Sequence, residues 1–181
     1  MMKKLMVLFA VAALVMLLFP AGTYAWSEDD PGIAPKLIAA KQFWVGDVLI
    51  WNDGANLYID YHTWDSSRYC LIEAHAHVAT SVALIPQKNG NPIPGQFMFK
   101  DDDLGCTSFA RFVYPLPAGW TPGTELIIAA HAVVQKPSEP GWEETAWTVE
   151  CGQLQDYTFG GKQWAAWVPY KLEAYPPPAV P

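Results

Sequence analysis

The chain has 181 residues, with 11 Lys and Arg against 18 Asp and Glu, which gives a formal net charge of −7 at pH 7. Phosphate backbones are bound by clustered Lys and Arg, so this charge argues against nucleic acid as a partner. The length suits a single domain with a sizeable core.

Residues 1–25 have the pattern of a secretory signal peptide. Lys3 and Lys4 precede the apolar run LMVLFAVAALVMLLF, and the small-residue sequence GTYA stands directly before Trp26. The apolar run is too short for a confident membrane span. We therefore expect an exported protein, secreted or on the cell surface, with no membrane attachment after cleavage.

After the signal peptide the sequence predicts a leader, one domain and a tail. Residues 26–35 are acidic and interrupted by Pro and Gly, which is typical of a flexible leader. Residues 36–174 contain the strand-like runs and form the predicted domain. Residues 175–181 are rich in Pro and predict an extended tail.

The elements predicted within the domain are strands. The first two runs form a hairpin, because an Asn-Asp-Gly cluster that favours a tight turn joins them. The Pro- and Gly-rich residues 86–97 predict a long irregular loop. In chain order the predicted strands cover residues 44–51, 56–62, 69–85, 106–116, 124–135, 144–150 and 162–172. Short strands at this spacing predict an all-β fold, a single antiparallel β-sandwich of about eight strands.

Three cysteines occur in a chain predicted to reach a compartment where disulfides persist. Cys70 shares the strand alternation of Ile72 and Val78, which predicts a buried free thiol. Cys106 and Cys151 stand in Gly-flanked segments, so the sequence favours a disulfide between these two.

The stretch CLIEAHAHVA contains the candidate site. Alternation along a strand places Glu73, His75 and His77 on one face. His131 and Glu144 come from later predicted strands, and imidazole with carboxylate is a ligand set that suits zinc. We expect Glu73 and His75 to face His131, with Glu144 close enough to bond one imidazole and His77 farther out.

Two interpretations of Glu73, His75, His131 and Glu144 stay open. One is a site for a divalent metal ion, zinc or calcium; the other is a structural polar network with no cofactor. The apolar sequence LIIAAHAVV around His131 favours the network, because it suggests a buried imidazole held by a carboxylate. No set of nucleophile and base stands out as catalytic.

The acidic run Asp101 to Asp103 lacks the spacing of an EF-hand loop. A solvated acidic turn is the favoured interpretation, with a surface calcium site as the alternative.

Nine tryptophans are many for a chain of this length. Trp64, Trp120 and Trp142 stand in predicted loops, where exposed rings could stack on sugars and make a carbohydrate-binding module. Large aromatic side chains usually fill cores. We therefore assign the strand tryptophans to the core: Trp44, Trp51, Trp147, Trp164 and Trp167.

An ordered set of segments extends over residues 36–173: LYIDY, IEAHAHV, IPQKNGNPIPGQF, IAAHAVV, EETAW and GKQWAAWVPYKL. This set resembles a family of secreted or surface-exposed proteins of undetermined function. The resemblance implies a β-rich extracellular domain and no particular reaction. On it, Glu73 and His75 match a Glu-x-His pattern, His131 a histidine strand, and Glu143 with Glu144 an acidic pair.

These observations favour a non-catalytic secreted or cell-surface protein that binds or builds structure. Its expected partners are a surface polymer, a carbohydrate or further copies of itself. The alternatives are a carbohydrate-binding module that uses the loop tryptophans and a metal-dependent enzyme with the Glu/His site.

Overall fold

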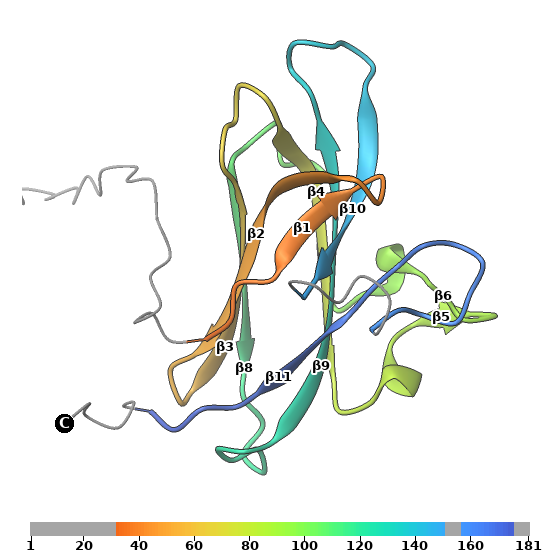
Figure 1. Ribbon diagram of the computed structural model, residues 1–181. Helices are drawn as coiled ribbons and strands as arrows, with labels where there is room; N and C mark the ends of the chain where they lie inside the picture. Colours follow the sequence, from red (N-terminus) through yellow and green to blue (C-terminus); the bar gives the residue numbers. More distant parts are fainter. Residues whose placement is uncertain (1–31, 151–156, 176–181) are drawn as a thin grey trace, which may run out of the picture.

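The computed structural model describes residues 32–150 and 157–175 (Figure 1). The predicted signal peptide, residues 26–31 of the predicted leader, Cys151 and residues 176–181 of the predicted tail lie outside the described residues.

The described residues form one antiparallel sheet of nine strands, and the predicted all-β fold is confirmed. Its strands are β1 (Lys36–Ala39), β2 (Phe43–Asn52), β3 (Asn56–Thr63), β4 (Cys70–Ala79), β7 (Phe99–Asp101), β8 (Phe109–Pro115), β9 (Glu125–Gln135), β10 (Glu143–Val149) and β11 (Val168–Lys171). Their order is β7-β4-β9-β10-β1-β2-β3-β8, and β11 pairs with β9. Two short strands, β5 (Gln87–Lys88) and β6 (Asn91–Pro92), form a separate hairpin between two 3-10 turns, η1 (Val82–Leu84) and η2 (Pro94–Gln96).

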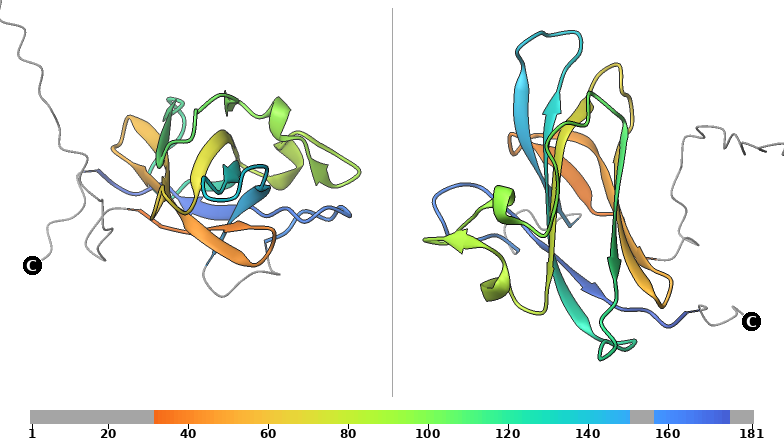
Figure 2. Two further views of the ribbon diagram at one scale, coloured as in Figure 1. Left: turned by 90° about the horizontal axis from the view of Figure 1, so that it is seen from above. Right: turned by 180° about the vertical axis from the view of Figure 1, so that it is seen from behind.

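The long sheet curls until it is nearly closed, so that β2 and β3 lie opposite β4 and β9 (Figures 1 and 2). Its two end strands approach each other through Phe99 of β7 and Phe112 of β8, whose stacked rings have centroids 5.4 Å apart. Side chains from both halves of the sheet fill the space inside. The largest fully buried ones include Tyr61, Leu37, Ile50, Leu57, Ile59, Leu71, Leu126 and Ile128.

The predicted hairpin of β2 and β3 is present. Asp53 in its turn accepts hydrogen bonds from the amides of Ala55 (2.9 Å) and Asn56 (2.7 Å) and from the Tyr58 hydroxyl (2.7 Å). These three donors favour the charged carboxylate, and the pKa of Asp53 falls to about 2, with the Tyr58 hydroxyl as the largest cause.

Strand β4 is shorter than the predicted run and contains a bulge. It ends at Ala79, and its pairing with β9 shifts by one residue between Leu71 and Glu73. Beyond the bulge the predicted alternation is confirmed: Ala74, Ala76 and Val78 belong to the inner core. The side chains of Glu73, His75 and His77 therefore project from the outer face.

Two segments cover the outer face of β4, β9 and β10. One contains η1, the β5–β6 hairpin and η2; the other is residues 157–167 before β11, and both lie beside β9 on one side of the molecule (Figure 1). Beneath them is a second apolar cluster that includes Ile85, Phe97, Ala129, Trp147, Phe159 and Ala165. The Asn91 side chain joins the segments by accepting a 2.8 Å hydrogen bond from the Gln163 amide.

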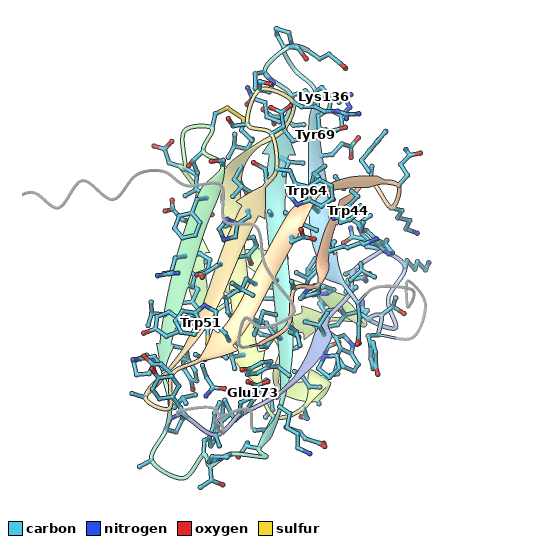
Figure 3. All side chains as sticks on the ribbon, turned by 60° about the vertical axis from the view of Figure 1, so that its left-hand side comes forward. Trp44, Trp51, Trp64, Tyr69, Lys136 and Glu173 are labelled. Carbon is cyan, nitrogen blue, oxygen red and sulfur yellow. A yellow bond between two sulfur atoms is a disulfide. The ribbon has the colours of Figure 1, made fainter. Side chains whose placement is uncertain are left out.

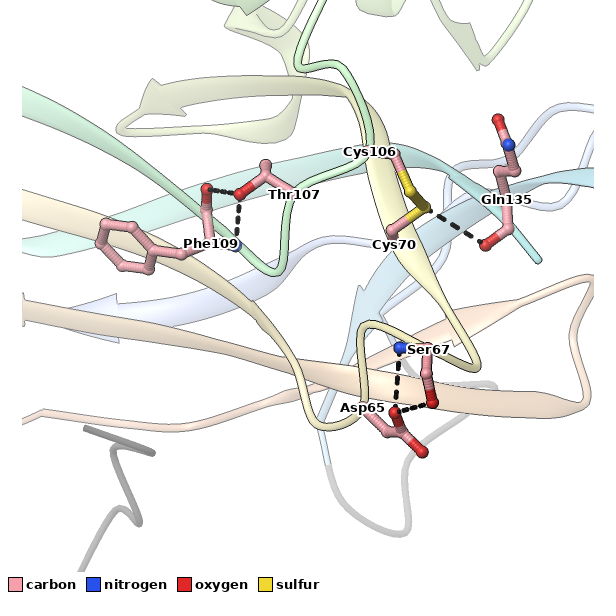
Figure 4. Close-up of a disulfide and its surroundings, with 7 residues drawn as sticks. All are labelled: Asp65, Ser67, Cys70, Cys106, Thr107, Phe109 and Gln135. Atoms are coloured by element: carbon pink, nitrogen blue, oxygen red, sulfur yellow. Dashed lines mark hydrogen bonds between the residues drawn. A yellow bond between two sulfur atoms is a disulfide. The ribbon is translucent and has the colours of Figure 1, made fainter. Parts of the chain in front are cut away.

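The predicted disulfide between Cys106 and Cys151 is wrong, because Cys106 is bonded to Cys70 (Figure 4). The bulge breaks the alternation on which the free-thiol assignment of Cys70 rested. The chain after β7 also returns alongside β4, where Leu71 and Thr107 form a β-bridge, and the Cα atoms of the two cysteines are 4.9 Å apart.

Among the described residues, no helix has the length and apolar character needed to cross a membrane.

Candidate functional site

The site is built on neighbouring strands of the covered outer face. His75 of β4 lies directly opposite His131 of β9, and His131 lies opposite Trp147 of β10. The His131 and Trp147 rings have centroids 4.8 Å apart. Pairing register thus creates a row of two imidazoles and one indole.

The two imidazoles contact each other. Nδ1 of His75 is 3.1 Å from Nδ1 of His131, so one of the two nitrogens donates a hydrogen bond to the other. Both side chains are almost fully buried, with residue exposures of 3% and 6%. Burial, together with the neighbouring His75, lowers the pKa of His131 to about 3, so His131 is neutral at pH 7.

The other ring nitrogen of His75 meets a carboxylate. Nε2 of His75 donates to Oδ1 of Asp102 over 2.6 Å, and Asp102 itself is largely exposed. From the inner side, the buried Tyr61 hydroxyl donates to the backbone oxygen of His75 (2.8 Å). Both faces of the sheet therefore hold His75 in place.

Glu73 completes a cluster of three side chains of the kinds that can ligate a metal ion. One ligand atom each from Glu73, His75 and Asp102 lies within 4.8 Å of the others. The three side chains combine one imidazole with two carboxylates, a donor set that binds divalent transition metals. His131 is not one of the three, and its Nδ1 faces the imidazole of His75.

The predicted place of Glu144 at the site is wrong. Glu144 pairs with Val134 of the inner core and precedes Ala146 on the same face of β10, whereas Thr145 and Trp147 line the outer pocket. Strand alternation therefore directs the Glu144 side chain away from the two histidines.

Asp102 is the carboxylate that the sequence analysis missed. The favoured interpretation of Asp101 to Asp103 was a solvated acidic turn, but β7 pairs with β4 and brings this turn beside His75. The run of three aspartates was the available signal. Only the pairing of these strands shows which histidine it meets.

A pocket of about 780 Å³ opens over the cluster. It is bounded by the two covering segments, the β1–β2 turn and the strands beneath. Its lining consists of Ala40, Lys41, Glu73, His75, Pro92, Pro94, Gly95, Asp102, His131, Val133, Thr145, Trp147, Gln163, Trp164 and Ala165. Polar groups converging on a concave, largely apolar site are typical of ligand-binding pockets.

His77 lies outside this lining, on the neighbouring part of β4. Its Nδ1 accepts a hydrogen bond from the Met98 amide (3.2 Å), and its ring lies 5.6 Å from Phe97. These contacts hold the covering segment against β4.

The three loop tryptophans have separate surroundings. Trp64 contacts Trp44, Trp120 contacts Tyr114, and Trp142 packs between Phe43 and Tyr69. Trp120 and Trp142 are also partly buried against the inner core.

Trp44 is not in the core, contrary to the sequence analysis, because its residue exposure is 43%. It lies beside Trp64, which is 52% exposed (Figure 3). The indole N–H groups of Trp44 and Trp64 donate to the Asp47 carboxylate over 3.1 and 2.7 Å. The Lys36 ammonium lies 3.8 Å from the ring centre of Trp44. The exposed indoles are thus held by contacts within the molecule.

Comparisons of the chain with protein-family models, with curated proteins and with solved structures found no match. The family resemblance of the sequence motifs therefore stays a prediction, and the function is argued from the site itself.

Proposed function

We propose that this protein is an exported binding protein that holds a divalent transition-metal ion, zinc by preference, through Glu73, His75 and Asp102. The observation that carries the proposal is the approach of three ligand atoms to within 4.8 Å at a pocket. Two carboxylates and an imidazole this close together can share one divalent ion, whose charge would balance both carboxylates at once.

The geometry needs little adjustment to hold zinc. Ligand atoms about 2.0–2.2 Å from a tetrahedral zinc ion are about 3.3–3.6 Å from one another. The 2.6 Å contact between His75 and Asp102 would open by about 1 Å, with the metal at Nε2 and the ring proton of His75 on Nδ1 instead. The ligand atoms that are farthest apart, up to 4.8 Å, would approach each other by up to about 1.5 Å.

His131 would act as the positioning residue of this site. A histidine that binds a metal through one ring nitrogen usually donates from the other, which fixes the ring. Here Nδ1 of His75 faces Nδ1 of His131 at 3.1 Å. Because His131 is neutral at pH 7, it can accept that bond without placing a second positive charge near the metal.

Export is supported by the signal-like residues 1–25 and by the disulfide between Cys70 and Cys106. Disulfides persist outside the reducing cytosol. N-terminal sequencing of exported protein should give Trp26 as the first residue. An exported protein that still begins at Met1 would contradict the signal-peptide assignment.

A metal-dependent enzyme is the second candidate function. Catalytic zinc sites have three protein ligands and one open position, and here three donors border a pocket. The binding function is preferred because His131, the lining imidazole outside the proposed ligand set, is engaged through Nδ1 with His75 and so is assigned to positioning that ligand.

The metal proposal is tested by zinc titration of chelator-treated protein, followed by calorimetry and thermal melting. One zinc ion per chain should bind and raise the melting temperature. His75→Gln should abolish both effects. His77→Gln is the matched control, since His77 is on the same strand face but outside the pocket, and it should leave zinc binding intact. A melting temperature unaffected by chelator and zinc would leave the cluster as a structural network.

A further inference from the structure

We propose that the metal-loaded pocket binds a small organic carboxylate, whose charged group takes the open metal position while its apolar body lies along the aromatic wall. This inference rests on the proposed metal site and names the ligand class that the site would take.

The charges of the lining residues make such binding depend on the metal. The carboxylate and ammonium side chains of the lining are Glu73, Asp102 and Lys41, whose formal charges sum to −1 in the empty pocket. A divalent ion changes this to +1. An anion is therefore disfavoured by the empty pocket and attracted by the loaded one.

Lys41 supplies the second positive charge. It stands in the tight turn between β1 and β2, where Ala40 and Lys41 both have positive φ, 48° and 64°. Neither residue is glycine, so this backbone is strained, and such strain often accompanies functional positions. The turn contributes both residues to the pocket lining, on the side of β10.

The walls fit an apolar or aromatic ligand body. Trp147 and Trp164 line the pocket from β10 and from the segment before β11, and Pro92 and Pro94 line it from the other covering segment. A volume of about 780 Å³ lies within the usual range for small-molecule sites, about 300–1,000 Å³. A ligand with a carboxylate at one end and a ring at the other would use both the metal and these walls.

The test uses Co²⁺ in place of zinc, because its visible absorption reports each change in its ligands. The full-length mature protein is loaded with one Co²⁺ and titrated with phenylacetate and, separately, with uncharged phenylacetamide. Phenylacetate should shift the Co²⁺ spectrum saturably, and phenylacetamide should not. Without metal, calorimetry should detect no phenylacetate binding.

Two variants with matched charge changes locate the site. Lys41→Gln should weaken phenylacetate binding about 2- to 5-fold, the effect of losing one exposed charge. Lys100→Gln is the control. Lys100 lies on β7, opposite His75 of β4, but is outside the pocket lining, so this variant should bind phenylacetate with unchanged affinity.

The outcomes separate the two proposals. Tight binding of one Co²⁺ with a spectrum that phenylacetate leaves unchanged would overturn the carboxylate proposal and keep the metal site. Equal shifts with the acid and the amide would also overturn it, because charge would then play no part. A protein that takes up no Co²⁺ would overturn both.

Discussion

Asp102 and His75 are 27 positions apart in the sequence, yet Oδ1 of Asp102 lies 2.6 Å from Nε2 of the buried His75 imidazole. The antiparallel pairing of β4 with β7 brings them together, since Asp102 directly follows β7. The Cys70–Cys106 disulfide ties the same loop to the start of β4. The candidate site therefore depends on one strand and on the loop bonded to it.

Asp102→Asn should lower zinc affinity by more than about 10-fold, because an amide is a poorer zinc ligand than a carboxylate. Glu144→Gln removes a carboxylate that points away from the site and should leave zinc affinity unchanged. Calorimetric titration of both variants gives the comparison. An effect of Glu144→Gln equal to that of Asp102→Asn would contradict the position of Asp102 at the site.

His131→Ala should lower the free energy of unfolding by about 1–3 kcal/mol, because it removes a buried side chain and leaves Nδ1 of His75 without this partner. It should also weaken zinc binding about 10- to 100-fold, the usual effect of losing a residue that orients a metal ligand. Denaturant unfolding and zinc titration measure the two effects. A stability loss with unchanged zinc affinity would show that His131 does not position the metal ligand.

Replacing both Cys70 and Cys106 with Ala should destabilise the protein by about 2–5 kcal/mol, since the disulfide closes a loop of 36 residues. Zinc affinity should also fall, because the bond holds the loop that contains Asp102. Cys151→Ala should leave this disulfide intact. Peptide mapping without reductant should find Cys70 linked to Cys106; a peptide joining Cys106 to Cys151 would contradict the structure.

Asp53→Asn should destabilise the protein at neutral pH and have little effect near pH 2. The folded-state pKa of Asp53 is about 2, below its ordinary value of 3.8, so its charge stabilises the fold above pH 3.8 and that contribution disappears as the pH falls toward 2. Urea unfolding of wild type and variant from pH 2 to pH 7 measures the difference. Tyr58→Phe removes the largest cause of the shift and should reduce the same pH dependence. A difference between wild type and Asp53→Asn that stays constant with pH would contradict this account.

The strands of the fold were predictable because their side chains alternate or cluster in ways that burial imposes. The hairpin of β2 and β3 was predicted from the Asn-Asp-Gly turn, and the outer-face row of Glu73 and His75 from alternation along β4. These features depend on neighbours in the sequence, which a single chain displays directly.

The errors concern partners that are distant in sequence or shifted by one residue. A bulge in β4 reverses the faces of the residues before Glu73. Simple alternation therefore assigned Cys70 to the wrong face of the strand. Glu144 is one position from Thr145, which does line the pocket, and a one-residue difference in a strand reverses the face. Asp102 could be assigned to His75 only from the pairing of β7 with β4.

The central claim is that Glu73, His75 and Asp102 hold one divalent ion, and a crystal structure of the zinc-soaked protein tests it most directly. Anomalous diffraction at the zinc edge should show one peak about 2.0–2.2 Å from Nε2 of His75, with a carboxylate oxygen of Glu73 and one of Asp102 at similar distances. A map without this peak, in which Nε2 of His75 still lies 2.6 Å from Oδ1 of Asp102, would contradict the claim.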